Sequence, residues 1–157
     1  MGIEFKKITQ LPDSLLCGEI EKAVKSFVAD SHAEEANVDP EGMRKQTLQS
    51  IAERVTYPVD GRQFWIAEHE GELLTYVLAH VGRDVDNELT YWLTQAWVNP
   101  KVRGHKIVKL WYSQLVAEAK RLMCKHMMII SSRGDKAYQR FLGREWHQYA
   151  ILLKKDL

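Results

Sequence analysis

Apolar and polar residues follow two periods along the chain, which predicts a mixture of strands and helices. Strict alternation is typical of half-buried strands, and apolar positions three or four residues apart are typical of amphipathic helices. In chain order the pattern predicts a strand at 3–8, a helix that starts at 12–14 and runs to 28, a helix at 40–55, strands at 64–68, 73–81 and 89–98, a helix at 105–125, a strand at 127–130, a helix at 134–142 and a strand at 149–153. The polar segment 30–40 is expected to be an acidic connector.

This order of elements predicts an α/β (α+β) fold with one mixed central sheet of about six to seven strands, flanked by about four helices. The three strands between 64 and 98 form a meander, so most neighbours in the sheet are antiparallel. The strand–helix–strand unit from 89 to 130 makes strands 89–98 and 127–130 parallel neighbours, because such a crossover returns to the sheet in the same direction.

The loop between strand 89–98 and helix 105–125 carries a local concentration of positive charge. Its basic residues are Lys101, Arg103, Lys106 and Lys109, and no acidic residue lies between them. A helix start leaves several backbone N–H groups without partners, and the helix dipole adds partial positive charge there. We therefore expect a phosphate or pyrophosphate site at this loop. A solvated basic turn is the alternative interpretation.

The residue spacing in this loop resembles the pyrophosphate loop of the GNAT superfamily, the acyl-CoA-dependent N-acyltransferases. Val98, Pro100, Arg103 and Gly104 match its Val-x-Pro-x-x-Arg-Gly pattern. The predicted order of elements is also similar to the GNAT order over nearly the whole chain. The resemblance therefore implies a GNAT fold.

The resemblance implies acetyl-CoA, or another acyl-CoA, as the cofactor. Its pantetheine arm would lie between the two parallel strands, which splay apart in the family. Lys106 and Val108 depart from the family, which has small residues at both positions. The residues that the resemblance places against the cofactor are Trp97, Val98, Asn99, Arg103, Gly104, His105, Lys106, Ile107, Val108, Gly134 and Phe141.

The resemblance also implies catalytic positions, which this chain fills only in part. When the family's later motif is laid on Gly134 to Trp146, Phe141 stands where a tyrosine usually protonates the leaving thiolate. Tyr138, one helical turn earlier, is the candidate general acid, and an ordinary packed aromatic is its alternative role. The backbone amide of Val98, or of its neighbour, would polarise the acyl oxygen. Trp92 occupies the region where many members carry a glutamate base. The remaining polar candidates for a base are Glu68, His80, Glu88 and Gln95, and the sequence alone assigns none of them.

Composition narrows the class of protein. With 157 residues, 45% hydrophobic and 27% charged, the chain is expected to form a single domain over residues 1–157. The formal net charge of +1 excludes a globally basic nucleic-acid binder, so any anion site is local. No apolar run reaches membrane-spanning length, the first residues lack a signal-peptide core, and Cys17 and Cys124 lack metal-ligand spacing. These features predict a cytoplasmic protein with buried free thiols, no metal and no membrane contact.

The leading hypothesis is an N-acetyltransferase that passes an acetyl or acyl group to a primary amine of a small molecule or peptide, by direct transfer in a ternary complex. The main alternative is a GNAT-fold protein that has lost catalysis and serves as a binding or structural module. A third is a protein that grips nucleic-acid phosphates through residues 101–109, which the near-neutral charge disfavours. Whether the chain forms a homodimer is left open.

Overall fold

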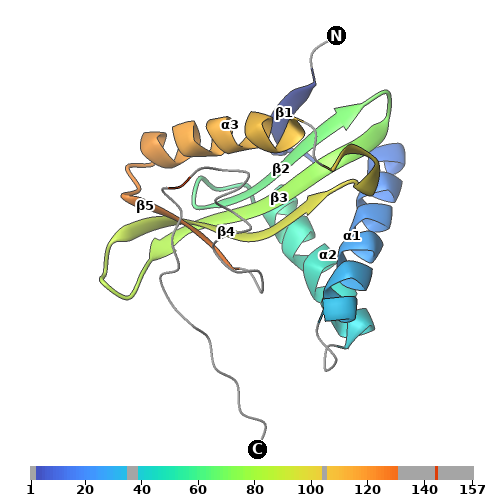
Figure 1. The fold of residues 1–157 in the computed structure, drawn as a ribbon, viewed down its shortest axis with the longest axis horizontal. Helices are drawn as coiled ribbons and strands as arrows, with labels where there is room; N and C mark the ends of the chain where they lie inside the picture. The colour runs from blue at the N-terminus through green and yellow to red at the C-terminus, as the bar shows by residue number, and fades with distance from the viewer. Residues whose placement is uncertain (1–2, 35–38, 104–105, 131–143, 145–157) are drawn as a thin grey trace, which may run out of the picture.

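A computed structural model of the protein describes residues 3–34, 39–103, 106–130 and Arg144. In chain order its elements are β1 (Glu4–Lys7), α1 (Ser14–Glu34), α2 (Pro40–Thr56), β2 (Arg62–His69), β3 (Glu72–Arg83), β4 (Leu89–Val98), the 3-10 turn η1 (Pro100–Val102), α3 (Ile107–Arg121) and β5 (His126–Ile129). Figure 1 shows α3 along one face of the sheet and α1 with α2 on the other face. The order of elements agrees with the predicted order up to β5.

The five strands form one sheet in the order β1-β2-β3-β4-β5. The first four strands are antiparallel neighbours, and β5 pairs with β4 in parallel. The predicted mixed sheet, with its meander and its parallel pair, is therefore confirmed. The described residues hold five strands and three α-helices, fewer than the six to seven strands and four helices predicted. The helix expected at 134–142 and the strand expected at 149–153 lie outside the described residues.

The first helix is longer than the sequence predicted. α1 continues to Glu34, so the segment from Asp30 to Glu34 is helical, and the prediction that it belongs to a connector is wrong. Residues 30–34 contain one apolar residue, Ala33, and therefore display no hydrophobic period. The following helix, α2, begins where it was predicted, because the side chain of Asp39 accepts a hydrogen bond from the N–H of Glu41 over 3.2 Å and caps the helix.

The third helix is shorter than the sequence predicted. α3 begins at Ile107 and ends at Arg121, four residues before the expected end. Met123 takes a left-handed backbone conformation with a φ of 57°, and the N–H of Cys124 donates to the carbonyl of Ala119 over 2.9 Å. A stop of this kind usually carries glycine, and Met123 offers no such signal in the sequence.

The hydrophobic core has one layer on each face of the sheet. Under α3, the buried stripe consists of Ile107, Trp111, Leu115 and Ala119, as the helical period predicted. The other layer packs α1 and α2 against β2 and β3 around Tyr76, which is fully buried. Both layers use the alternating faces of the same strands, so the sheet is covered on both sides along its middle strands.

Two further sequence predictions concern thiols and membranes. Cys17 and Cys124 are free, but each is half-buried rather than buried, so the prediction of buried thiols is wrong in that respect. Across residues 3–34, 39–103 and 106–130, no helix combines the length and the apolar character that crossing a bilayer requires.

Candidate functional site

The turn after β4 is held by the side chain of Asn99. Its Oδ1 accepts from the N–H of Lys101 over 3.0 Å, and its Nδ2 donates to the carbonyl of Leu73 and to Oε1 of Glu72, both over 3.1 Å. Asn99 is buried, so these bonds satisfy an amide that would otherwise be costly to bury. The side chain of Asn99 fixes the turn that leads to the predicted site, and its contact with the cofactor stays a prediction.

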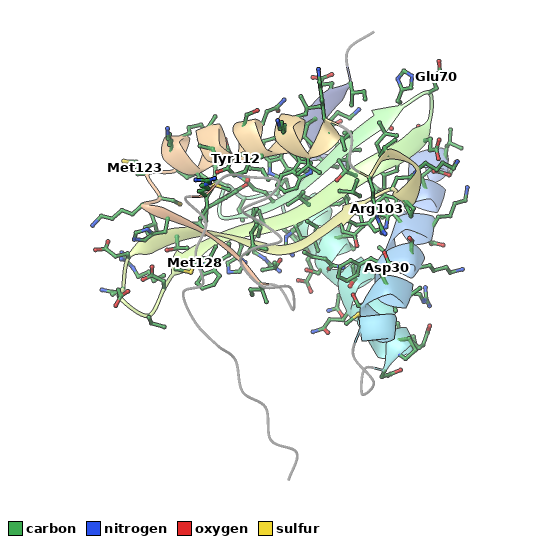
Figure 2. The ribbon with its side chains drawn as sticks, in the orientation of Figure 1. Asp30, Glu70, Arg103, Tyr112, Met123 and Met128 are labelled. Atoms are coloured by element: carbon green, nitrogen blue, oxygen red, sulfur yellow. The ribbon has the colours of Figure 1, made fainter. Side chains whose placement is uncertain are left out.

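Two of the four basic side chains of the loop have acidic partners from distant elements. Lys101 Nζ lies 2.8 Å from Oε1 of Glu72 at the start of β3. Arg103 donates to Oδ2 of Asp30 on α1, and Figure 2 shows these two side chains pointing toward one another. The sequence showed no acidic residue within the loop, and the fold supplies two from outside it.

The start of α3 keeps its positive character. Lys106 is the N-cap residue, its side chain makes no capping hydrogen bond, and the first turn contains no acidic residue. In the described part of the chain, Lys106 and Lys109 are exposed and form no ion pair with a carboxylate. No side chain of the described residues accepts from the first N–H groups of the helix, which is the arrangement that suits a phosphate. Val108 is half-buried against the core under α3.

The parallel pair of strands separates halfway along β4. Pairing with β5 runs from Thr90 opposite His126 to Leu93 opposite Ile129, and the N–H of Ile130 makes a last bond to the carbonyl of Leu93 over 3.2 Å. Among the described residues, 95–98 of β4 pair only with β3. Within the described part of the chain, the strand edge beyond Leu93 is therefore open, at the end that leads into α3.

A β-bulge lies at the point of separation. Leu78 pairs with Gln95 and Ala79 pairs with Leu93, so Thr94 is an extra residue on β4. A bulge bends its strand and increases the local twist, and bulges are frequent beside active sites. Sequence analysis missed this feature, because Thr94 is an ordinary strand residue with no glycine near it.

The backbone N–H of Val98 points toward the side of β4 that β5 has left. Asn99 N donates to Leu74 O over 2.8 Å, so these two residues form a hydrogen-bonded pair. In antiparallel strands such pairs alternate with pairs whose backbone N–H and C=O groups point away from the neighbouring strand. Val98 and Thr75, the next pair along, are of this second kind, so the N–H of Val98 points away from β3. The carbonyl of Val98 faces the same way and accepts from Arg103 Nε over 3.1 Å. The open edge thus carries a backbone donor.

Three further predicted cofactor contacts, Trp97, Ile107 and Val108, flank this edge. Trp97 is 6% exposed and stacks on Tyr76 with ring centres 5.9 Å apart, so its ring belongs to the core. Ile107 is also buried in the core, under α3. Val108 packs beside it. The predicted residues that fall outside the described residues are Gly104, His105, Gly134, Tyr138 and Phe141.

Geometry separates the four candidates for a general base. Glu68 pairs with Lys6 at the β1 edge of the sheet over 3.0 Å. Glu88, in the turn before β4, pairs with Lys125 over 2.7 Å. The third, Gln95, has an amide side chain, which is not basic. Its Nε2 donates to the hydroxyl of Tyr76 over 3.0 Å.

The fourth candidate, His80, lies beside the point where the strands separate. It is half-buried on β3 opposite Trp92, and the two rings stack with centres 6.2 Å apart and planes 11° apart. Partial burial, and then the charges of Arg54 and Arg62, lower the pKa of His80 from its ordinary value of 6.5. The imidazole is therefore neutral at pH 7 and able to accept a proton.

Comparisons with known proteins agree with this geometry. The family model described as Acetyltransferase (GNAT) family matches residues 27–144. No curated protein sequence matches the chain. A Pyrococcus furiosus protein, provisionally assigned as an acetyl transferase, has a TM-score of 0.71 at 16% identity, covering 99% of this chain and 100% of that one.

Two similar structures were solved with coenzyme A or with acetyl-CoA. The aminoglycoside N-acetyltransferase AAC(6')-Iy in complex with CoA has a TM-score of 0.65 at 15% identity, covering 100% of this chain and 98% of that one. A Clostridium acetobutylicum protein solved with acetyl-CoA has a TM-score of 0.62 at 14% identity, covering 97% of this chain and 96% of that one. At these identities the structures share the fold. Because the family model matches residues 27–144, most of the sequence, the chain belongs to the GNAT acetyltransferase family.

Proposed function

We propose that this protein is an acyl-CoA-dependent N-acyltransferase that transfers an acetyl or other acyl group to a primary amine. Transfer is direct, within a complex of both substrates, and residues 1–157 act as a single domain. The observation that carries the proposal is the open edge of β4 beside an uncapped helix start. The first feature gives an acyl arm a place between strands, and the second gives a diphosphate a set of backbone donors.

The residues at the start of α3 fit a diphosphate group. Backbone N–H groups from Lys106 to Lys109 lack acidic neighbours within their turn, and the exposed ammonium groups of Lys106 and Lys109 add positive charge. Arg103 is within the same loop and its guanidinium is only partly buried. We assign coenzyme A binding to these groups, together with Val108 and the N–H groups of Gly104 and His105.

The residues along the open edge fit an acyl transfer. A bound thioester supplies an activated acyl carbon and a thiolate leaving group. The N–H of Val98 would hold the acyl oxygen, because it points into the gap between β4 and β5. His80 lies on the face opposite to α3, five residues along β3 from Thr75, the residue opposite Val98, and is therefore about 17 Å away from Val98. It is neutral at pH 7, and it would take up the proton of the amine nitrogen through a chain of water molecules as the amide bond forms. Tyr138 is the proposed acid that returns a proton to the thiolate.

The acceptor is proposed only as a chemical class, a small molecule or peptide with a primary amine. The similar enzyme AAC(6')-Iy acts on aminoglycosides, which carry such amines. The groups that would face the acceptor, His80 and Trp92, form a half-buried aromatic platform. A platform of this kind can hold the apolar part of an amine or its cationic form. Homodimer formation and a cytoplasmic location stay predictions.

The proposal is tested by ligand binding and by thiol release. Melting temperature is measured with coenzyme A, with acetyl-CoA and with inorganic phosphate at equal ionic strength, since a ligand that binds only the native state raises it. Release of free thiol from acetyl-CoA is then followed across a panel of primary amines. We expect a rise with both coenzyme A forms, none with phosphate at the same low concentration, and amine-dependent thiol release.

Each other outcome identifies a different function. A rise with coenzyme A and no thiol release with any amine would indicate the silent binding module. No rise with either form would remove the cofactor assignment. A rise with any polyanion that disappears as salt is added would favour binding to nucleic-acid phosphates.

A further inference from the structure

A small pocket opens where the end of β1 meets the connection between α2 and β2. It measures about 80 Å³, and its walls come from residues 7–9 on one side and from the segment between Pro58 and Gln63 on the other. Arg54, in the last turn of α2, lines it as well. A pocket of this size is several times larger than the space that one water molecule needs.

Arg54 is a buried cation with an unused pair of donors. It is 5% exposed. Its Nε donates to the carbonyl of Ala79 over 3.5 Å, and its Nη1 donates to the carbonyl of Ser50 over 3.1 Å and to the hydroxyl of Ser50. These acceptors are neutral. Among the described residues, Nη2 of Arg54 makes no hydrogen bond.

The other charged groups around the pocket are paired with one another. Arg62 Nη2 lies 2.8 Å from Oε2 of Glu53. Lys7 Nζ lies 3.1 Å from Oε1 of Glu118 and 3.8 Å from Oδ1 of Asp60. In the described part of the chain no carboxylate lies within ion-pair distance of Arg54. Burial, and then the charge of Arg62, lower the pKa of Arg54 from its ordinary value, which agrees with a local excess of positive charge.

We propose that this pocket binds a small oxyanion, a phosphate or carboxylate group, through Nη2 of Arg54. A buried cation is normally paired, because leaving it without a counter-charge is costly. The guanidinium group is rigid and planar, and its paired N–H donors match the oxygens of both anions. The carboxylate of Asp60 also lines the pocket, and it is neutralised by Lys7 over 3.8 Å and by Arg121 over 3.1 Å. The narrow volume favours a small anion over a polymer.

The pocket is separate from the proposed coenzyme A site. In the register of the sheet, Arg62 of β2 lies opposite His80 of β3, and His80 lies opposite Trp92 of β4. The pocket therefore lies at the level of the first half of β4. Val98 and the basic loop lie six residues further along that strand, which corresponds to about 20 Å. The inference therefore stands whether or not the protein transfers acyl groups.

The test is a calorimetric titration with inorganic phosphate and, separately, with acetate, at constant ionic strength. Arg54 is 5% exposed, so removing its side chain would leave a buried gap and endanger the fold. The informative variant is therefore Thr9→Glu. Thr9 is an exposed residue that lines the pocket, and a glutamate there places a competing carboxylate at its mouth. The matched control is Gln10→Glu, which adds the same charge one residue away, at an exposed position outside the lining.

We expect saturable binding of at least one of the two anions, weakened at least tenfold by Thr9→Glu and changed less than twofold by Gln10→Glu. The anion that binds more tightly shows whether the pocket prefers a phosphate group or a carboxylate group. Phosphate can also bind at the basic loop, so the titrations are repeated with Arg103→Glu, which should leave the response to Thr9→Glu unchanged. Absence of saturable binding, or equal weakening by both glutamate variants, would overturn the proposal.

Discussion

Asp30 on α1 binds the guanidinium of Arg103, which also donates through Nε to the carbonyl of Val98 over 3.1 Å. The two side chains of the ion pair are 45% and 48% exposed. An ion pair so exposed contributes about 0–1 kcal/mol to stability, so an incoming phosphate could replace the carboxylate at little cost. The contact thus holds Arg103 beside the open edge of β4 and partly neutralises it while no anion is bound.

Replacing Asp30 with asparagine should therefore strengthen coenzyme A binding. Asp30→Asn removes the competing charge and leaves Arg103 held by Val98, so we expect the dissociation constant to fall about fivefold, which corresponds to about 1 kcal/mol. Calorimetric titration at fixed salt measures it. Glu21→Gln, which removes a charge from another exposed position of α1, is the control and should have no effect. An unchanged or higher dissociation constant for Asp30→Asn would mean that the carboxylate does not compete.

Reversing the charge of Arg103 should abolish coenzyme A binding without unfolding the protein. Arg103→Glu places a carboxylate among the backbone donors that would hold the diphosphate, and we expect affinity to fall at least a hundredfold, about 3 kcal/mol. Lys120→Glu makes the same change at an exposed position at the other end of α3 and should leave affinity within a factor of two. Melting temperatures of both variants show whether the fold persists. Normal affinity in Arg103→Glu would place the cofactor elsewhere.

These contacts show which parts of the site a sequence can reveal. The strand from Leu89 to Val98 was predicted with its observed bounds, because its apolar run ends at a loop marked by proline and glycine. The helix after it was found through its buried stripe. Asp30 is 73 residues away from Arg103 in the chain, and their contact depends on how α1 lies against the sheet. No local pattern encodes such a pair.

The bulge at Thr94 was invisible in the sequence for a related reason. It is a property of the register between β3 and β4, since it appears only when both strands are aligned. The same holds for His80, whose neighbours Trp92, Arg54 and Arg62 come from three other elements. The sequence could place His80 among four candidates, and the tertiary environment distinguishes it from the other three.

His80→Gln should remove the acid limb of the pH–rate profile of amine acetylation. The pKa of His80 lies below 6.5 in the folded protein, so the base is active at pH 7 and is lost as pH falls through that lowered value. For the wild type we expect kcat/KM to decline on the acid side with an apparent pKa below 6.5. The variant should be about a hundredfold slower or more at pH 7.

The control for this measurement is the same substitution at another histidine. His69, at the end of β2, is exposed and lies 3.8 Å from Glu70, so His69→Gln should keep both the rate and the acid limb. If His80→Gln retains the wild-type limb, another group is the base. A variant that only raised KM would assign His80 to acceptor binding instead.

Trp111→Phe should change stability little, in contrast to Trp65→Phe. Trp111 is 5% exposed and its ring N–H has no acceptor among the described residues, so phenylalanine relieves an unpaired donor and loses some packing area. We expect these effects to offset to within about 1 kcal/mol. In Trp65 the ring N–H donates to Gln63 Oε1 over 3.0 Å, and the ring stacks on Phe5. Its replacement should cost about 2 kcal/mol. Urea unfolding compares the two, and an equal loss would contradict the assignment.

Glu118 on α3 accepts hydrogen bonds from side chains on three elements, β1, β2 and α3. Its carboxylate should therefore make the stability of the fold fall at acid pH. Arg121 first, and then Gln63 and Lys7, hold the pKa of its carboxyl at about 2, below the ordinary value of 4.5. Lys7 Nζ lies 3.1 Å from Oε1, and Gln63 Nε2 lies 2.7 Å from the same atom. Because the folded pKa is lowered, the carboxylate stabilises the native state above about pH 4.5, and that stabilisation is lost as pH falls toward 2.

Glu118→Gln should therefore lower the free energy of unfolding at pH 7. It should also make the free energy of unfolding fall less steeply as the pH is lowered. We expect a loss of about 2 kcal/mol at pH 7, less than the full pKa difference implies because Arg121 is half-exposed and screened. Near pH 2 the stabilities of the variant and the wild type should approach one another, since the native carboxyl is then about half protonated. Glu88→Gln is the control, because Glu88 pairs only with the exposed Lys125 among the described residues and should shift stability by less than about 1 kcal/mol. Urea unfolding at pH 7 and at pH 3 measures both variants. A Glu118→Gln protein whose stability falls with acid as steeply as that of the wild type would show that other carboxyl groups govern acid unfolding.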